Sequence, residues 1–363
     1  MSVVYKKLED VCEILDSRRV PITAKDRKAG TYPYYGANGL QDYVADYIFD
    51  DELVLLAEDG GNFGSKERPI AYRVSGKCWV NNHAHVLKAK PNMHVDYLCY
   101  ALMFYDTEGL VNGATRQKLT QAAMRQMVIP YRDMTEQLQI IKKISQIVRS
   151  IEKRKEELQL LDQLVKSRFI ELFGDPVSNS MGLPTEPMTT VCAIIDGDRG
   201  KNYPKQDEFS DTGYCLFLNA KNVTATGFSF ENRMFITKEK DKALHNGKLE
   251  RGDVVLTTRG TLGNLAFYDD SVPFKNVRIN SGMVILRMKK SVMTEVFFME
   301  QFKLQLQSIK GKIASGSAQP QLPISTMNKI RILLAPMALQ EQFAAFVEQT
   351  DKSKLCGRRE VAA

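Results

Sequence analysis

The stretch TEQLQIIKKISQIVRSIEKRKEELQLLDQLVKSRFIELF, from Thr135 to Phe173, decides how the rest of the chain is organised. Its 39 residues contain neither Gly nor Pro and are mostly strong helix formers. Thr135 can cap the first turn, and Gly174 followed by Asp175-Pro176 ends the pattern. The sequence therefore predicts one continuous helix over 135–173, roughly 58 Å long at the usual rise per residue.

Apolar residues in this stretch recur at three- and four-residue spacing, as in an imperfect coiled-coil heptad that Lys155 and Asp162 interrupt. A core helix within one globular domain is the alternative, but helices average only about 11–12 residues. We therefore interpret the stretch as a rod that buries its apolar face on a partner helix. The expected seam residues are Ile141, Ile144, Val148, Ile151, Leu158, Val165, Phe169 and Leu172.

Length and composition indicate a multi-domain protein of the cytoplasm. A chain of 363 residues exceeds one usual domain, and 44% hydrophobic residues suffice for ordinary cores. The N-terminal sequence has no apolar targeting segment, no run reaches membrane-spanning length, and the six cysteines lack C-x-x-C spacing. We expect reduced thiols and no membrane partner. The net charge of +7 permits a nucleic-acid partner without requiring one.

The rod separates two regions that follow one plan. Residues 1–134 are predicted to be strand-rich with a helix over 95–104, 174–184 form a linker, and 185–336 repeat the first region. The basic excess lies in the second region, where 185–334 hold 21 basic and 15 acidic residues against 17 of each in 1–134. The predicted fold is α+β, with two β-rich domains in a pseudo-two-fold repeat and long antiparallel helices between them.

The repeat rests on short segments that occur in the same order in both regions, and it indicates a duplicated domain. The matched pairs are 8–14 with 188–194, 50–55 with 250–256, 58–64 with 258–264, 82–87 with 280–285, 113–119 with 316–322, and Pro130 with Glu136-Gln137 against Pro336 with Glu341-Gln342.

The second helix, predicted over 337–363, looks shorter than the first. Its apolar pattern begins with Phe343, Phe346 and Val347 and is lost near Cys356, so we expect the helix to stop near Lys354. Part of the first seam (Ile151, Leu158, Val165 and Leu172) would then be exposed or covered by another chain. This predicts a truncated or phase-variable copy that associates poorly with its partners.

Common catalytic motifs are absent from the sequence. It has no phosphate-binding P-loop, no G-x-G-x-x-G between strand and helix, no H-E-x-x-H pair, no G-x-S-x-G elbow and no N-P-P-[FYW]. His83 and His85 would share a strand face but lack a third metal ligand. Asp196, Asp198 and Glu208 lie in one loop, for which a solvated loop is the better interpretation. We expect a non-catalytic protein that needs neither metal nor cofactor.

Loops between the predicted strands are rich in amide and basic side chains, which suit phosphates and base edges. Ordinary protein surfaces also carry such clusters. The candidate DNA-binding residues are Asn81, Asn82, His83, Arg116, Gln117, Lys118, Arg199, Lys201, Asn202, Tyr203, Asn219, Lys221, Asn222, Arg259, Lys275, Asn276, Arg278, Asn280, Gln319 and Gln321.

This combination resembles the specificity subunits of type I restriction-modification enzymes. The resemblance covers the chain to about Lys354 and rests on the duplicated G-x-x-x-x-x-L segments at 113–119 and 316–322, the Pro…Glu-Gln openings, and the helix ending at 153–176. It implies two target recognition domains that read the half-sites of a gapped double-stranded DNA sequence. It also implies helices that dock adenine methyltransferase subunits, in a complex that recruits a translocase-nuclease subunit.

Two other functions remain open on the sequence alone. A coiled-coil scaffold would assemble proteins without touching DNA, and salt-sensitive binding to duplex DNA would distinguish it from a DNA reader. An enzyme using the 196–208 loop or the His83/His85 pair would show metal-dependent activity of the isolated chain.

Overall fold

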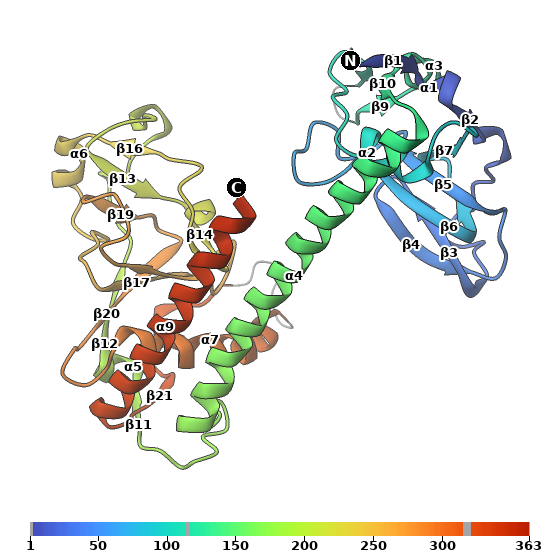
Figure 1. The fold of residues 1–363 in the computed structure, drawn as a ribbon. Helices are drawn as coiled ribbons and strands as arrows, with labels where there is room; N and C mark the ends of the chain where they lie inside the picture. The colour runs from blue at the N-terminus through green and yellow to red at the C-terminus, as the bar shows by residue number, and fades with distance from the viewer. Residues whose placement is uncertain (1–2, 114–115, 315–320, 363) are drawn as a thin grey trace. The chain divides into compact units, whose positions relative to one another are not determined.

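The computed structural model describes residues 3–113, 116–314 and 321–362 and divides into two compact units, Met1–Glu152 and Lys153–Ala363 (Figure 1). The long helix is continuous: α4 spans Met134–Phe173. The prediction for 135–173 is therefore confirmed to within one residue, and so is the α+β class.

The first unit is built on a six-stranded mixed sheet in the order β2-β7-β5-β6-β3-β4, in which only β3 and β6 pair in parallel. This unit is strand-rich, as predicted, and it contains the predicted helix at 95–104 as α2. Its elements are β1 Val4–Lys7, α1 Leu8–Val11, β2 Cys12–Ile14, η1 Asp16–Arg18, β3 Ala29–Gly36, β4 Gly39–Val44, β5 Phe49–Ala57, β6 Ala71–Val80, β7 Ala84–Ala89, α2 Val95–Met103, β8 Val111–Asn112, β9 Lys118–Leu119, α3 Gln121–Gln126 and β10 Val128–Tyr131.

The second unit contains a four-stranded sheet, β12-β20-β17-β18, a three-stranded sheet, β16-β13-β19, and the two-stranded sheets β11-β21 and β14-β15. Its elements are β11 Thr185–Pro187, α5 Met188–Val191, β12 Cys192–Asp196, η2 Gln206–Glu208, β13 Cys215–Leu218, η3 Ala220–Asn222, β14 Val223–Thr224, β15 Gly227–Phe228, β16 Phe235–Ile236, α6 Lys238–Ala243, β17 Asp253–Thr257, β18 Leu265–Tyr268, β19 Val277–Ile279, β20 Met283–Met288, α7 Glu295–Ala314, α8 Ile324–Met327, β21 Arg331–Leu333 and α9 Met337–Ala362.

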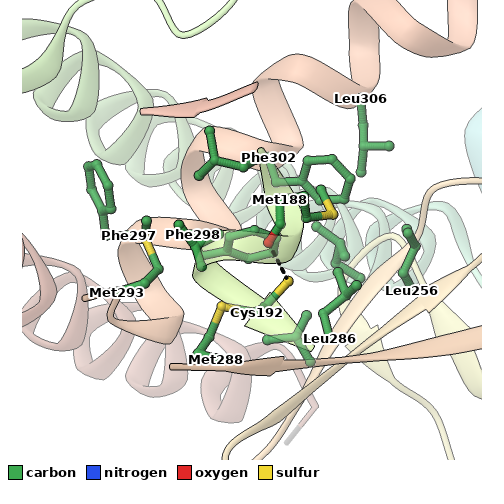
Figure 2. Close-up of a cluster of buried hydrophobic side chains, with 14 of the residues drawn as sticks. Met188, Cys192, Leu256, Leu286, Met288, Met293, Phe297, Phe298, Phe302 and Leu306 are labelled. Atoms are coloured by element: carbon green, nitrogen blue, oxygen red, sulfur yellow. Dashed lines mark hydrogen bonds between the residues drawn. The ribbon is translucent and has the colours of Figure 1, made fainter. Parts of the chain in front are cut away.

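Each unit has a central strand that is buried on both faces. Alternate residues of a strand point to opposite faces, so Val54 and Leu56 of β5 enter the core beneath α2 while Leu53 enters the other cluster. In the second unit, Leu256 of β17 packs beneath α7, where Phe298 lies close to the Met188–Cys192 segment (Figure 2). The two units thus use the same arrangement of a buried strand beneath a helix.

Equivalent hydrogen bonds confirm parts of the repeat. The Cys12 thiol donates to the Leu8 carbonyl at 3.1 Å, as the Cys192 thiol does to Met188 at 3.4 Å (Figure 2). Burial raises the pKa of both thiols to about 12. Similarly, Leu119 N–H donates to the Glu58 carbonyl at 2.7 Å and Leu322 N–H to the Thr258 carbonyl at 3.1 Å.

Two segments of the predicted repeat need a change of register. Glu58 N–H donates to the His83 carbonyl and Thr258 N–H to the Gly282 carbonyl, so His83 corresponds to Gly282 and Asn81 to Asn280, one residue away from the sequence match. At the helix openings, Gln137 matches Gln340 rather than Gln342. The weak sequence identity left these registers undetermined, because several short alignments fit equally well.

Helix α9 runs antiparallel to the second half of α4 within the second unit. Phe343 packs against Phe169 and Phe173 with ring centroids 5.5 and 5.6 Å apart, and Lys354 forms a 2.8 Å ion pair with Asp162. Asp162 interrupts the apolar seam because it meets a lysine on the partner helix.

Two expectations about this seam are wrong. The helix α9 does not stop near Lys354 but continues to Ala362. Val165, expected to be exposed or covered by another chain, is buried within this chain, and Leu172 packs against the core, while Ile151 and Leu158 are half-buried.

Candidate nucleic-acid interface

In the first unit, a cluster of charges follows the central strand β5. Asp59 accepts a hydrogen bond from Arg116 at 2.6 Å, and its Oδ1 lies 2.7 Å from Nδ1 of His83. Glu58 pairs with Lys118 at 3.0 Å. The structure therefore brings three predicted residues, His83, Arg116 and Lys118, together around two carboxylates.

Beneath this cluster lies a buried ionic network centred on His85. Its Nδ1 lies 2.6 Å from Asp16 Oδ2 and its Nε2 lies 2.9 Å from the Leu119 carbonyl oxygen. The carbonyl oxygen and the ionised Asp16 carboxylate are both acceptors, so an N–H on either ring nitrogen has an acceptor within reach. Arg19 completes the network by donating to Glu58 at 2.7 Å.

The carboxylates of this network are held in their ionised form. Burial opposes the ionisation of Asp16, but hydrogen bonds from His85 and from the Val86 N–H outweigh it and lower its pKa. For Glu58, burial is likewise outweighed by Arg19 and Lys118, so its pKa is also lowered.

Asp16, Glu58 and His85 also place ligand atoms within 4.8 Å of one another, the spacing of a metal site. Protein groups already occupy these atoms. Both nitrogens of His85 have partners, and the two oxygens of Glu58 pair with Arg19 and Lys118. The donor set is therefore that of a protein ion network, in which Arg19 supplies the charge that a cation would bring.

The second unit has a cavity of about 350 Å³ in the corresponding place, lined by Asp196, Arg199, Thr258, Arg259, Val284, Gln321, Leu322, Pro323 and Ile324. Three of these, Arg199, Arg259 and Gln321, are predicted DNA-binding residues. Arg199 donates to Asp196 and to the Ser281 carbonyl, each at 3.1 Å. Arg259 and Gln321 are exposed, and their side chains make no hydrogen bond to the described part of the chain.

Three predicted DNA-binding residues are buried, which corrects their assignment. Arg278 donates to Asp241 and to neighbouring backbone carbonyls. Asn222 holds the turn that follows β13, and Asn81 donates to Gln41 at 3.1 Å. Sequence gave no means to separate these inward-facing side chains from exposed ones, because their partners lie far away in the chain.

The other predicted residues differ in their surroundings. Asn202 donates to the Ala243 carbonyl, Tyr203 packs on Phe217, and Asn219 caps η3. Asn276 and Asn280 are half-buried. Gln319 lies outside the described residues. The exposed members are Asn82, Arg116, Gln117, Lys118, Arg199, Lys201, Lys221, Arg259, Lys275 and Gln321.

The weaker catalytic alternatives lose their geometric basis. His83 and His85 have separate carboxylate partners, Asp59 and Asp16, and do not form one site. Asp198 accepts hydrogen bonds from the backbone N–H groups of Gly200, His245 and Asn246, which lower its pKa against the effect of burial. Glu208 accepts from the Lys205 N–H and pairs with Lys240.

Sequence reasoning missed the residues that organise the site in the first unit, Asp16, Arg19, Glu58 and Asp59. The predicted residues there were basic, amide and histidine side chains, and none of them was a carboxylate. A signal was present: Asp-x-x-Arg occurs at 16–19 and again at 196–199, in each case beginning two residues after the matched segments 8–14 and 188–194, and both copies form an ion pair.

Comparison with known proteins places both repeats in one family of sequences. The family model described as "Type I restriction modification DNA specificity domain" matches residues 2–161 and 189–359. A putative type I restriction enzyme specificity subunit of Haemophilus influenzae is 25% identical over 96% of this chain and 87% of its own length. The type I restriction enzyme MjaIX specificity subunit of Methanocaldococcus jannaschii is 21% identical over 94% of this chain and 85% of its own length.

Solved structures support the fold. The S subunit of a type I restriction-modification system from M. genitalium aligns with a TM-score of 0.57 and 15% identity over 100% of this chain and 92% of its own. A structure from a study of complex assembly in the type I restriction-modification system aligns with a TM-score of 0.54 and 14% identity. The alignment covers 100% of this chain and 94% of that one. Among the helices in the described ranges, none combines the length and apolarity that a membrane crossing requires.

Proposed function

Because the chain belongs to the type I restriction-modification DNA specificity family, in which it is a non-catalytic specificity subunit, we propose that it reads a bipartite, gapped DNA target. Each repeat takes one half-site. The first target recognition domain is assigned to 1–134 and the second to 185–336. Residues 135–173 form the spacer helix, 174–184 a linker, and 337–363 the second conserved helix.

The observation that carries this proposal is one framework with two different sets of loop residues. Equivalent strands and hydrogen bonds occur in both units, yet Glu58-Asp59 of the first unit is replaced by Thr258-Arg259 in the second. A protein that reads two half-sites places two similar modules at a fixed spacing. Divergence of the loops on a common framework lets the two half-sites differ in sequence.

Docking of the methyltransferase and translocase-nuclease subunits is assigned to the helices. Helix α4 exposes large apolar side chains, and exposed apolar surface on a helix is typical of an interface with another chain. These residues are Leu138, Ile147, Val148, Leu160, Leu164 and Ile170, each at least 39% exposed. The same exposure favours the second candidate function, a scaffold that assembles proteins and does not bind DNA.

The experiment that tests the proposal is a map of adenine methylation in the source cell, with and without the gene. Loss of methylation at two short half-sites around a fixed gap would support the proposal. Binding of the purified complex to duplex DNA at about 50 and about 200 mM salt distinguishes a DNA reader from a scaffold. A DNA reader should lose affinity steeply as the salt concentration rises, because it contacts phosphates. Unchanged methylation together with salt-independent behaviour would contradict the DNA-reading function.

A further inference from the structure

The cavity in the second unit occupies the position that the His85 network fills in the first. Ile14 pairs with Leu87 in the first unit and Ile194 with Leu286 in the second. His85 lies two residues before Leu87, and Val284 lies two residues before Leu286. Val284 is therefore the counterpart of His85. The other central strand gives the same result, because Leu56 pairs with His85 and Leu256 with Val284.

The remaining residues of the network follow the same equivalence. Asp16 corresponds to Asp196 and Arg19 to Arg199, each pair joined across one turn. Glu58 corresponds to Thr258, because each carbonyl accepts from the equivalent leucine N–H. Replacing Glu58 by threonine and His85 by valine removes two large polar side chains from this place. The second unit therefore keeps the Asp-Arg pair and has a cavity of about 350 Å³ beside it.

The cavity wall presents polar side chains with hydrogen-bonding groups that have no partner among the described residues. Asp196 Oδ1 accepts from the Gly197 N–H and from Arg199, whereas Oδ2 has no partner in the described ranges. The guanidinium of Arg259 and the side-chain amide of Gln321 also line the cavity, and neither has a hydrogen-bond partner among the described residues. The site thus combines a free carboxylate oxygen of Asp196 with the guanidinium of Arg259 and the amide of Gln321.

The cavity lining also includes the apolar residues Val284, Leu322, Pro323 and Ile324. Its size falls within the usual range of roughly 300–1,000 Å³ for small-molecule pockets. Apolar walls suit the faces of a flat ring, and polar groups suit its edges. An inorganic phosphate would leave the apolar wall without contacts and would face Asp196.

We propose that this cavity binds a guanine-type heterocycle. Arginine donates to O6 and N7 of guanine through two N–H groups, the geometry that Arg259 can supply. The N1–H and the 2-amino group on the Watson–Crick edge of guanine can donate to a carboxylate, and we assign this acceptor role to Asp196. Adenine matches this arrangement less well, because its ring nitrogen N1 is an acceptor.

The base must be unpaired, because a Watson–Crick partner occupies the edge that Asp196 would contact. Two sources fit this chemistry: a free guanine nucleotide, or an unpaired guanine of the bound DNA. The second source rests on the proposed DNA-reading function, and the first does not. The first unit binds no such base at the equivalent place, because His85 and Glu58 occupy it.

The test is a titration of the purified full-length chain with GMP and AMP, followed by calorimetry. We expect GMP to bind and AMP to bind at least about tenfold more weakly, as expected for the loss of a hydrogen bond to a charged group. Arg259→Gln should weaken GMP binding by about tenfold, while Arg233→Gln, which removes an exposed cation outside the cavity lining, should leave it unchanged.

A second variant fills the cavity with the side chains of the first unit. Thr258→Glu combined with Val284→His should abolish GMP binding while circular dichroism stays unchanged. Because this variant could disturb folding, Arg259→Gln at an exposed position provides the independent result. Absence of GMP binding, equal binding of AMP, or equal loss in Arg259→Gln and Arg233→Gln would each overturn the proposal.

Two oligonucleotides then identify the source of the base. One is a single-stranded oligothymidine that contains one guanine, and the other contains none. Tighter binding of the first, lost in Arg259→Gln, would support an unpaired DNA base. GMP binding without that preference would support a free nucleotide. Binding of duplex DNA, measured in parallel, distinguishes failure of the cavity proposal from failure of the DNA-reading function. Arg259-dependent duplex binding without GMP binding would overturn the cavity proposal and leave the DNA-reading function intact.

Discussion

Gln137 of helix α4 and Gln340 of helix α9 make the same three hydrogen bonds in the two repeats. Each Oε1 accepts from the backbone N–H of the residue immediately before an earlier helix, His94 before α2 at 2.8 Å and Thr294 before α7 at 2.9 Å. Each Nε2 donates to two backbone carbonyls, one of them in the loop before its own helix. Both glutamines are fully buried. They fix the start of each long helix to the globular part of its repeat.

Truncating either glutamine should therefore be costly. Gln137→Ala leaves one N–H and two carbonyls without their partner, and we expect a loss of about 3 kcal/mol in the free energy of unfolding of the first unit. Trp79, the only tryptophan, lies in that unit and reports its urea transition by fluorescence. Gln139→Ala on the exposed side of the same helix is the control. Equal transitions for the two variants would contradict this role.

Phe343 should dominate the packing of α9 on α4. Its ring is fully buried and lies within 5.6 Å of the ring centroids of Phe169 and Phe173. Phe343→Ala should lower the stability of the second unit by about 3–5 kcal/mol, because it leaves a cavity in the core. Thermal unfolding followed by circular dichroism measures the effect. Phe346→Ala, at a half-buried position on the same helix, should cost clearly less.

The buried Asp241–Arg278 pair should make the second unit sensitive to acid. Burial opposes the ionisation of Asp241, but Lys248 and Arg278 outweigh it and lower its pKa below the ordinary value of 3.8. The stability that this carboxylate contributes is complete above its unfolded pKa and is lost as the pH falls through the lower folded pKa.

Asp241→Asn should accordingly destabilise the protein at pH 7 by about 3–5 kcal/mol, because Arg278 keeps its buried charge without a counter-ion. The variant should also lose less stability than the wild type between pH 5 and pH 3. Urea unfolding across this range measures both effects. A variant with the same acid dependence as the wild type would show that other carboxylates control the acid limb.

The spacer helix should act as a ruler for the DNA target. Its roughly 58 Å correspond to about 17 base pairs as an upper limit. Inserting one heptad within 150–160 adds roughly 10 Å of helix and should lengthen the gap between the half-sites. Methylation mapping in cells that carry the variant measures the gap. Continued methylation with the original gap would contradict the ruler.

The sequence alone determined the long helix, the duplicated plan and the family. A helix of 39 residues without Gly or Pro is specified by local preferences, and repeated segments need only be compared with each other. The register of the weaker segments was wrong by one residue at His83 and by two at the second helix opening, because hydrogen bonds fix register and short matches do not.

Only the tertiary structure decided which polar loop residues face inward and what replaces them in the other repeat. Arg278 and Lys275 are similar basic residues three positions apart, yet one is buried on Asp241 and the other is exposed. Likewise, His85 and Val284 occupy equivalent positions on matched strands, but one completes an ion network and the other lines a cavity. Local preference acts between neighbours in the chain, whereas burial and ion pairing depend on partners tens of residues away, which only the folded chain brings together.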